Sequence, residues 1–223
     1  MTTLFVTASG TDVGKTFVTL RLIDELTAAG YRVRALKPVA SGFDAADPGA
    51  SDTGALLLAQ GLEASAANLD AVSPWRFAAP LSPDMAAARE QRAISFAALV
   101  DFCRAPRDAD VTLIEGIGGV MAPLDATHTV FDWIVELDAP ALLVVGSYLG
   151  TLSHSLAAAA ALRTGGARVA GVIVSESAEQ PAPAAETAMV LARFLKPTKV
   201  QVLPRHAARG ATPLLPLLTR YLR

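Results

Sequence analysis

The stretch Ala8-Ser9-Gly10-Thr11-Asp12-Val13-Gly14-Lys15-Thr16 lies between a short apolar segment and a helix-like pattern. The apolar segment, residues 4–7, predicts a strand, and residues 17–26 carry the apolar spacing of a helix that stops at Gly30. A strand, a glycine-bearing turn and Gly-Lys-Thr at a helix start are the context of a phosphate-binding loop. The backbone N–H groups of such a turn and of the first helical turn attract anions.

Two side chains of this loop have predicted tasks. Lys15 would add a positive charge near the β- and γ-phosphates, and the Thr16 hydroxyl would be one ligand of Mg²⁺. The usual pattern has a glycine where Ser9 stands, with Gly10 following it here, so we interpret the loop as a deviant form. The alternative is a plain glycine turn followed by an ordinary surface lysine.

The composition indicates a globular protein with ample material for a core. The chain has 223 residues, of which 52% are hydrophobic and 18% are charged, with a net charge of −2. We expect one nucleotide-binding domain over residues 1–223. No broad basic surface attracts nucleic acid. The N-terminus has no signal segment, and the apolar residues 156–162 are too few to cross a membrane, so we expect a cytoplasmic protein.

The single cysteine, Cys103, excludes a disulfide within the chain and fits a reducing compartment. It lies in an apolar helical pattern, which favours a buried packing thiol over a nucleophile.

Apolar runs alternate with helix-length segments along the whole chain. Further strands are expected at residues 32–36, 110–115, 141–145, 169–174 and 200–203. Helices are expected at residues 52–60, 82–90, 95–105, 129–137, 151–164, 183–195 and 214–221, with Ser51, Ser82 and Ser95 as N-caps and residues 68–81 as a loop. This alternation predicts an α/β fold with three layers, a doubly wound, mostly parallel sheet of the P-loop NTPase type with helices on both faces. Ligands would bind beyond the carboxyl ends of the strands.

Several polar residues follow these strands. Glu115 closes a strand before Gly116-Ile117-Gly118-Gly119, and its carboxylate could hold Mg²⁺ opposite Thr16. The alternative is a helix-capping or surface glutamate, which the glycine run disfavours. Asp52 begins a helix, where it would either complement the helix dipole or approach the metal. Lys37 ends a strand and would neutralise charge on a transferring phosphoryl group, unless it is simply a solvated lysine.

Two further segments suit a small-molecule substrate. Ser41 is either a turn residue or a hydrogen-bond donor to the substrate. Gly150-Thr151-Leu152-Ser153 opens a helix whose free N–H groups would suit a carboxylate. His128 and His154 have no metal-ligand spacing, so we treat both as ordinary polar residues.

Taken in order, these segments resemble the dethiobiotin synthetase family over residues 3–174. The matching segments are Val13-Gly14-Lys15-Thr16, Lys37-Pro38-Val39-Ala40-Ser41-Gly42, Ser51-Asp52, Ala79-Pro80-Leu81-Ser82-Pro83, Glu115-Gly116-Ile117-Gly118-Gly119, Pro123-Leu124, Asp132-Trp133 and Leu149-Gly150-Thr151-Leu152-Ser153-His154. Each segment alone is common, but the ordered set is specific.

The resemblance implies a ligase that forms C–N bonds in biotin biosynthesis. Its substrates would be 7,8-diaminononanoate, CO₂ or bicarbonate, and ATP with Mg²⁺, and its products dethiobiotin, ADP and phosphate. A substrate amine captures CO₂ as a carbamate, which attacks the γ-phosphorus. The second amine then closes the ureido ring and expels phosphate.

The resemblance also implies roles for individual residues. Lys15 and Lys37 would be catalytic, and Thr16, Asp52 and Glu115 would be directed at the metal. Nucleotide contacts would come from Asp12, Val13, Gly14, Lys15, Thr16, Phe17, Asp52, Glu115, Gly116, Ile117, Gly118, Ser175, Glu176, Pro204, Arg205 and His206. Substrate contacts would come from Ser41, Pro80, Ser82, Gly118, Gly150, Thr151, Leu152 and Ser153. The last four would come from the partner subunit of a homodimer with active sites at its interface.

The chain departs from the family at several positions. Ala8-Ser9-Gly10 replaces the usual loop opening, Asp12 stands where glutamate is common, and Tyr148 stands where lysine is common. Ser175-Glu176 replaces an asparagine-containing pair that reads adenine. A serine hydroxyl cannot copy the two-pronged hydrogen bonding of an amide, so other nucleoside triphosphates stay open beside ATP.

Three other functions share part of this pattern. Related amidoligases have the same architecture but usually carry a glutaminase region, for which this chain has neither the length nor a plausible catalytic cysteine. Dimeric switch ATPases of the partition or site-selection type place a lysine early in the loop, and residues 8–11 hold none. A degenerate domain without activity is disfavoured because Lys15, Thr16 and Lys37 are all present.

Overall fold

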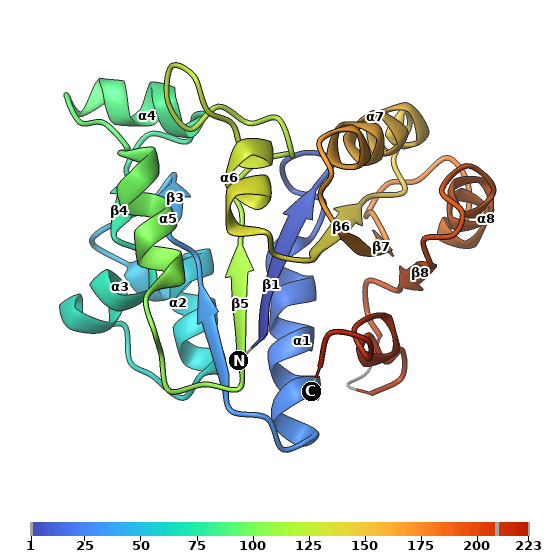
Figure 1. The fold of residues 1–223 in the computed structure, drawn as a ribbon, viewed down its shortest axis with the longest axis horizontal. Coiled ribbons are helices and arrows are strands. Elements are labelled where there is room, and N and C mark those ends of the chain that lie inside the picture. The colour runs from blue at the N-terminus through green and yellow to red at the C-terminus, as the bar shows by residue number, and fades with distance from the viewer. Residues whose placement is uncertain (1, 208–209, 223) are drawn as a thin grey trace.

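The structure is a computed structural model that describes residues 2–207 and 210–222. Its main sheet has six parallel strands in the order β2-β5-β1-β6-β7-β8 (Figure 1). These strands are β1 (Thr2–Ala8), β2 (Val33–Leu36), β5 (Val111–Glu115), β6 (Ala141–Val145), β7 (Val169–Ser175) and β8 (Val200–Leu203). The predicted parallel, doubly wound α/β sheet is therefore confirmed.

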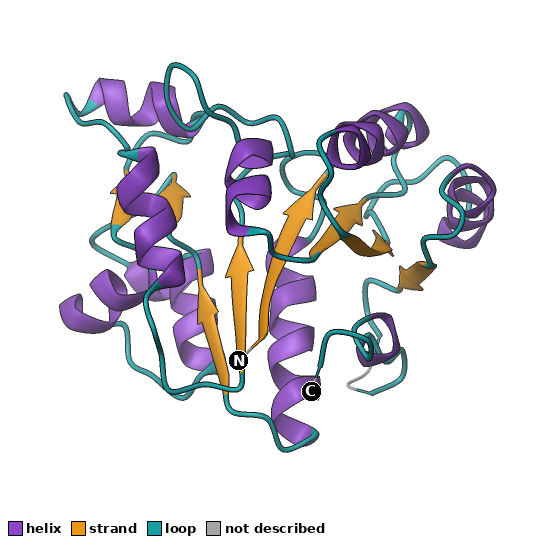
Figure 2. Cartoon of the chain, viewed as in Figure 1, coloured by secondary structure: helices purple, strands orange, loops and turns teal. Residues whose placement is uncertain are grey.

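Helices cover both faces of the sheet (Figure 2). They are α1 (Lys15–Ala28), α2 (Asp52–Ala59), α3 (Ala66–Val72), α4 (Pro83–Arg89), α5 (Phe96–Arg104), α6 (Val130–Leu137), α7 (Thr151–Thr164) and α8 (Ala184–Phe194), with the 3₁₀ turns η1 (Pro48–Ala50) and η2 (Leu215–Leu217). None of the helices in the described ranges is both long enough and apolar enough to cross a membrane.

Successive residues of each central strand feed two separate cores. In β1, Leu4 and Val6 belong to a core that includes residues of α1, α2 and η2, whereas Phe5 belongs to a core that includes residues of α5, α6, α7 and α8. Because neighbouring side chains of a strand point to opposite faces, a strand buried on both faces must be apolar throughout. The continuous apolar runs in the sequence therefore reflect a sheet that is covered on both sides.

The central strand leads directly into the predicted phosphate loop. β1 pairs with β5 on one side and with β6 on the other, with Leu4 opposite Leu113 and Phe5 opposite Ala141. The chain after β1 proceeds through α1 to β2, beyond β5, while β6 lies on the opposite side of β1. The loop thus lies where the strand order reverses, which is where open α/β sheets bind ligands.

The predicted loop at residues 68–81 is wrong. This region contains the end of α3 and the strand β4 (Trp75–Phe77), which pairs in parallel with β3 (Val39–Ser41) as a small second sheet. Ser65 caps α3 by accepting a hydrogen bond from the Asn68 N–H at 3.3 Å. Strands of three residues are too short to show a periodic pattern, which is why the sequence did not indicate them.

The predicted C-terminal helix at residues 214–221 is also wrong, because only the single turn η2 forms there. Pro213 and Pro216 lack the N–H donors that a continuous helix needs. Ser82 precedes α4, but its side chain does not cap the helix; its hydroxyl donates to Asp84 at 2.6 Å. Ser51 and Ser95 cap α2 and α5 as predicted.

Candidate active site

The phosphate loop has the backbone shape that anion binding requires. Asp12 and Gly14 have positive φ angles of 57° and 92°, which turn successive N–H groups toward one side of the loop. A Cβ atom on Gly14 would lie 2.4 Å from the hydroxyl oxygen of Ser175. The first turn of α1 carries no acidic side chain, so its positive dipole end is free to attract an anion.

Lys15 lies in this loop with its ammonium group held by two carbonyl oxygens. Its Nζ donates to Gly118 O at 2.8 Å and to Gly10 O at 3.3 Å. Burial, together with the nearby charge of Lys37, lowers the pKa of Lys15 from 10.5 to about 8. A bound polyphosphate would supply the negative charge that this lysine lacks.

Lys37 is buried and forms two ion pairs. Its Nζ lies 2.5 Å from Glu115 Oε1 and 3.0 Å from Asp52 Oδ2. Burial acts to lower the pKa of Lys37, but the charges of Glu115 and Asp52 outweigh it, and the pKa is raised. Burial likewise acts to raise the pKa of Asp52, but Lys37 outweighs it and the pKa is lowered. The site therefore holds Lys37 as a cation and Asp52 as an anion.

The pairing of β2 with β5 explains why Lys37 meets Glu115. The register places Leu36 opposite Ile114, so the next residue of each strand emerges at the same edge of the sheet. Sequence reasoning treated these two residues separately and missed their ion pair. The signal was available, because both residues end apolar strands that the fold class makes neighbours.

A divalent cation fits the residues predicted to hold it. Thr16 Oγ1 donates to Glu115 Oε1 at 2.9 Å. Asp52 is linked to the same carboxylate through Lys37, whose Nζ contacts both acids. Glu115 Oε2 is buried and accepts no hydrogen bond from the described part of the chain. A buried carboxylate oxygen with no partner is costly unless a cation or water satisfies it. No group of three or more His, Cys, Asp or Glu side chains within the described ranges could hold a metal, so a hydroxyl and phosphate oxygens would have to complete this site.

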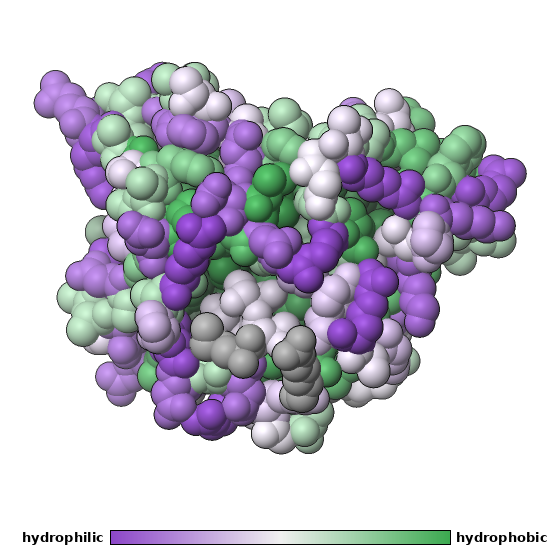
Figure 3. Space-filling model, in the orientation of Figure 1, coloured by the Kyte–Doolittle hydropathy of each residue, from purple (hydrophilic) through white to green (hydrophobic). Residues whose placement is uncertain are grey.

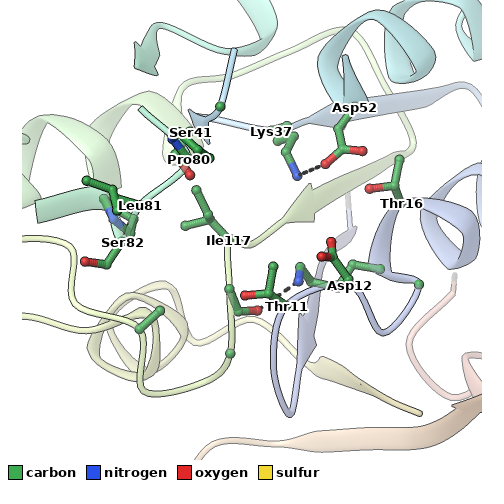
Figure 4. A pocket seen from close by; sticks show the side chains of 17 residues that line it. Thr11, Asp12, Thr16, Lys37, Ser41, Asp52, Pro80, Leu81, Ser82 and Ile117 are labelled. Atoms are coloured by element: carbon green, nitrogen blue, oxygen red, sulfur yellow. Dashed lines mark hydrogen bonds and ion pairs between the residues drawn. The ribbon is translucent and has the colours of Figure 1, made fainter. Parts of the chain in front are cut away.

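A cavity of about 930 Å³ joins the phosphate loop to the second lysine (Figure 4). Figure 4 shows Lys37, Asp52 and Thr16 at one end and Pro80, Leu81 and Ser82 at the other. The residues that line it are Thr11, Asp12, Gly14, Lys15, Thr16, Lys37, Ser41, Gly42, Asp52, Pro80, Leu81, Ser82, Pro83, Ile117, Gly118, Gly119 and Ala122. The structure thus gathers both predicted catalytic lysines and the predicted substrate residues Ser41, Pro80, Ser82 and Gly118 in one cavity. The other lining residues, Thr11, Gly42, Leu81, Pro83, Gly119 and Ala122, were not predicted as site residues.

A second cavity of about 440 Å³ adjoins the first, because Asp12 and Gly14 line both. Its other lining residues are Val13, Phe17, Ser175, Glu176, Ser177, Ala178, Arg205 and His206. Four of the five predicted nucleotide contacts that follow β7 or lie at its end and after β8 line this cavity: Ser175, Glu176, Arg205 and His206. Pro204 is not among its described lining residues. The two cavities therefore share the phosphate loop as a wall, and one extends to Lys37 and the other to residues that follow β7 and β8.

Glu115 and Gly116, at the carboxyl end of β5, are both buried. Glu115 is fully enclosed, and Gly116 lies against the ring of Phe5, where a Cβ atom would approach Phe5 Cε1 to 2.8 Å.

Cys103 is buried, and burial raises the pKa of its thiol to about 12, as expected of a packing residue. His128 stacks on Phe96 and pairs with Asp125, away from either cavity.

Comparison with known proteins shows the family to which this chain belongs. The family model AAA_26, described as an AAA domain, matches residues 2–216. The chain is 48% identical over 200 residues to the ATP-dependent dethiobiotin synthetase BioD of Methylobacterium nodulans, covering 86% of this chain and 89% of that protein. It is 41% identical over 221 residues to the BioD of Caulobacter vibrioides strain NA1000, covering 98% and 99%. The chain belongs to the dethiobiotin synthetase family. The resemblance noted from its motifs is therefore confirmed.

The fold also occurs outside the dethiobiotin synthetase family. The structure of the signal recognition particle receptor FtsY from Elizabethkingia anophelis superposes with a TM-score of 0.53 at 14% identity, covering 100% of this chain and 65% of that one. This likeness concerns the fold alone.

One predicted segment of the dethiobiotin synthetase site lies apart from both cavities. Gly150-Thr151-Leu152-Ser153 forms the start of α7, and none of these residues is among the described residues that line the cavity with Lys15 and Lys37. The Thr151 hydroxyl is already used, since it donates to Gly146 O at 2.8 Å. His154 N–H donates to Gly150 O, so the N–H groups of Leu152 and Ser153 precede the first α-helical bond.

Proposed function

We propose that this protein is an ATP-dependent dethiobiotin synthetase. It converts 7,8-diaminononanoate, CO₂ and ATP into dethiobiotin, ADP and phosphate. One amine and CO₂ form a carbamate, whose oxygen attacks the γ-phosphorus as the bond to ADP breaks. The second amine attacks the carbamoyl carbon, the ring closes and phosphate leaves. The observation that carries the proposal is the shared cavity of the phosphate-loop lysine and Lys37, in a chain of this family.

The two lysines divide the charge of the phosphoryl transfer between them. Lys15, in the loop, neutralises the β- and γ-phosphates, with the N–H groups of residues 12–17 around them. Lys37 faces the cavity from the end of β2 and stabilises the carbamate and the negative charge of the transition state. Because its carboxylate partners keep Lys37 protonated, it acts as an electrostatic group and not as a base.

Magnesium would be held by Thr16, Asp52 and Glu115. When bound, it would neutralise charge on the phosphate oxygens. The uncommitted oxygen of Glu115 and the Thr16 hydroxyl support this assignment. Asp52 stays ionised at neutral pH because Lys37 lowers its pKa, so it is ready to bind a cation.

The far end of the cavity suits the diamine and its carbon chain. Ser41 and Ser82 offer hydroxyl groups, and Pro80, Leu81 and Ile117 offer apolar surface. We assign the N–H groups at the start of α7 to the terminal carboxylate of a substrate bound mainly by the partner subunit. This assignment requires a homodimer in which each α7 reaches the other subunit's cavity. We also propose that residues 1–223 form one domain and that the enzyme is cytoplasmic.

The decisive experiment measures dethiobiotin and phosphate together. Purified protein is mixed with diaminononanoate, bicarbonate, Mg²⁺ and ATP, and both products are followed over time. We expect equal amounts of both, and no phosphate above background without the diamine. Phosphate release that does not depend on the diamine would instead indicate a switch ATPase, and the proposed function would be rejected.

A variant pair tests the role of Lys37. We expect Lys37→Gln to reduce kcat by about 100-fold or more, since one preorganised charge at a transition state contributes about 3 kcal/mol. Lys199→Ala, which removes an exposed lysine, serves as the matched control and should retain full turnover. Circular dichroism of both variants checks folding. If folded Lys37→Gln keeps wild-type turnover, Lys37 has no part in the mechanism.

A further inference from the structure

The second cavity, which we call the base-end cavity, is lined by a carboxylate. Glu176 follows β7 and lines this cavity together with Ser175, Phe17 and Arg205. Because the cavity shares Asp12 and Gly14 with the phosphate site, a nucleotide with its phosphates on the loop would place its base here. When ionised, a carboxylate can only accept hydrogen bonds, so it favours base edges that carry donors.

The carboxylate of Glu176 is held in place by two donors. The Arg205 N–H donates to its Oε2 at 3.0 Å, and Gln180 Nε2 donates to its Oε1 at 2.9 Å. These two hydrogen bonds lower the pKa of Glu176, and the bond from the Arg205 N–H has the larger effect. The carboxyl group is therefore an anion at neutral pH. Each oxygen accepts one hydrogen bond from the protein in these contacts and has a second lone pair for another.

The orientation of Gln180 is itself fixed from the neighbouring strand. Ser147 follows β6, is 1% exposed, and donates its hydroxyl proton to Gln180 Oε1 at 2.8 Å. Ser147 and Ser177 also exchange two hydrogen bonds, at 2.9 and 3.0 Å, between the backbone N–H of each and the hydroxyl of the other. A fully connected network of this kind fixes Glu176 with both oxygens as acceptors before any ligand binds.

We propose that Glu176 reads the edge of the nucleotide base and that this site accepts guanine nucleotides as well as ATP. The inference rests on the proposed function, because it assigns the base end of the same nucleotide site. Guanine presents two adjacent donors, N1–H and the 2-amino group, which match the two carboxylate oxygens. Adenine presents its 6-amino donor beside the acceptor N1, so it makes one hydrogen bond and places N1 against the negative charge. Ser175 and Ser177 can donate or accept and so tolerate either base.

Three nucleotides test this inference in the wild-type protein. Dethiobiotin formation is measured with ATP, GTP and ITP, since inosine keeps N1–H but lacks the 2-amino group. We expect kcat/KM for GTP to be at least one tenth of that for ATP, and that for ITP to be about fivefold or more below GTP, as one base-reading contact implies. A GTP value under one tenth of the ATP value, or equal values for ITP and GTP, would overturn the proposal.

A variant pair separates Glu176 from the rest of the cavity. Glu176→Gln replaces two acceptors by one acceptor and one donor, and a rotated Gln180 amide can still bond to it. We expect this change to lower the GTP-to-ATP ratio of kcat/KM about fivefold or more. Glu179→Gln, with the same loss of charge on an exposed residue of the same loop, should leave the ratio unchanged. An unchanged ratio in folded Glu176→Gln would refute the role of Glu176.

The two proposals can fail separately. If ATP supports dethiobiotin formation while GTP does not, the proposed function stands and the base-reading inference falls. If no nucleotide supports the reaction, the proposed function falls, and calorimetric titration with ATP, GTP and ITP still measures the base preference of the folded protein. In that titration GTP binding more than tenfold weaker than ATP binding would overturn the inference.

Discussion

The two buried lysines that line one cavity have pKa values shifted in opposite directions. Lys15 has only carbonyl oxygens within hydrogen-bond reach among the described residues, and burial and Lys37 lower its pKa to about 8. Lys37 touches two carboxylates, whose charges outweigh burial and raise its pKa. The free site therefore keeps Lys37 charged and leaves Lys15 short of negative charge, which is the deficit that a polyphosphate would fill.

The lowered pKa of Lys15 predicts that ATP affinity depends on pH. Bound phosphates would keep Lys15 protonated, whereas in the free protein it loses its proton as pH rises through about 8. ATP binding must then take up protons between about pH 8 and 10.5, and affinity should fall by up to about tenfold per pH unit there. In the same range the free protein should gain stability with pH, because its unfolded chain binds more protons than the folded one.

Titration calorimetry at pH 8 in buffers of different ionisation enthalpy measures this uptake. We expect about half a proton per ATP at pH 8, and close to none at pH 7, beyond the proton exchange of ATP itself. ATP affinity that is constant from pH 7 to 9.5 would show that Lys15 is charged in the free protein throughout.

At the scale of elements, the phosphate loop joins β1 to α1 and depends on a single glycine. Gly14 has a φ of +92°, and an added Cβ would meet Ser175 Oγ at 2.4 Å. Gly10, four residues earlier, has no heavy atom within 4 Å of such a Cβ. The two glycines of one loop therefore have different structural requirements, which a motif alone does not distinguish.

Alanine substitution should separate these two glycines. We expect Gly14→Ala to destabilise the protein by about 1–2 kcal/mol from the left-handed backbone alone, and to abolish measurable ATP binding because Ser175 must move. Gly10→Ala should change the free energy of unfolding by less than about 0.5 kcal/mol. Urea unfolding of both variants gives the comparison, and equal losses of stability in the two would show that the loop does not depend on Gly14 in particular.

How far the sequence predicted each element depended on its length and its burial. All six strands of the main sheet were predicted, and the central strands β6 and β7 have continuous apolar runs because both of their faces are covered. β3 and β4 have three residues each, and α3 was hidden by neighbouring proline and aromatic residues although Ser65 is a usable N-cap signal. Lys15, Lys37 and Ser41 were proposed one by one from their motifs, and the structure brings them into one cavity. The Lys37–Glu115 pair depended on strand register, and the Ser147–Gln180–Glu176 network on contacts between loops.

At the scale of the whole molecule, three large hydrophobic side chains are exposed directly before α7 and on α8. On the face shown in Figure 3, hydrophilic and hydrophobic residues are interspersed, with hydrophobic residues also toward the upper right, where Figure 1 places α7 and α8. Leu149, directly before α7, is 85% exposed, and Met189 and Phe194 of α8 are 64% and 63% exposed. Large exposed apolar side chains beside a predicted ligand segment suit a subunit interface.

If two copies associate through this region, a charge at Leu149 should separate them. We expect Leu149→Asp to weaken the dimer at least tenfold, because an aspartate would be buried at the interface without a partner. Leu58→Asp, on α2 and 78% exposed in the free chain, is the matched control and should leave the dimer intact. Sedimentation velocity over a range of concentrations measures both. In a separated monomer the start of α7 would no longer reach the cavity of the partner. Leu149→Asp should therefore also raise KM for diaminononanoate while ATP affinity is retained. A Leu149→Asp protein that stays dimeric, or a monomer with unchanged KM for the diamine, would show that α7 does not complete the partner's site.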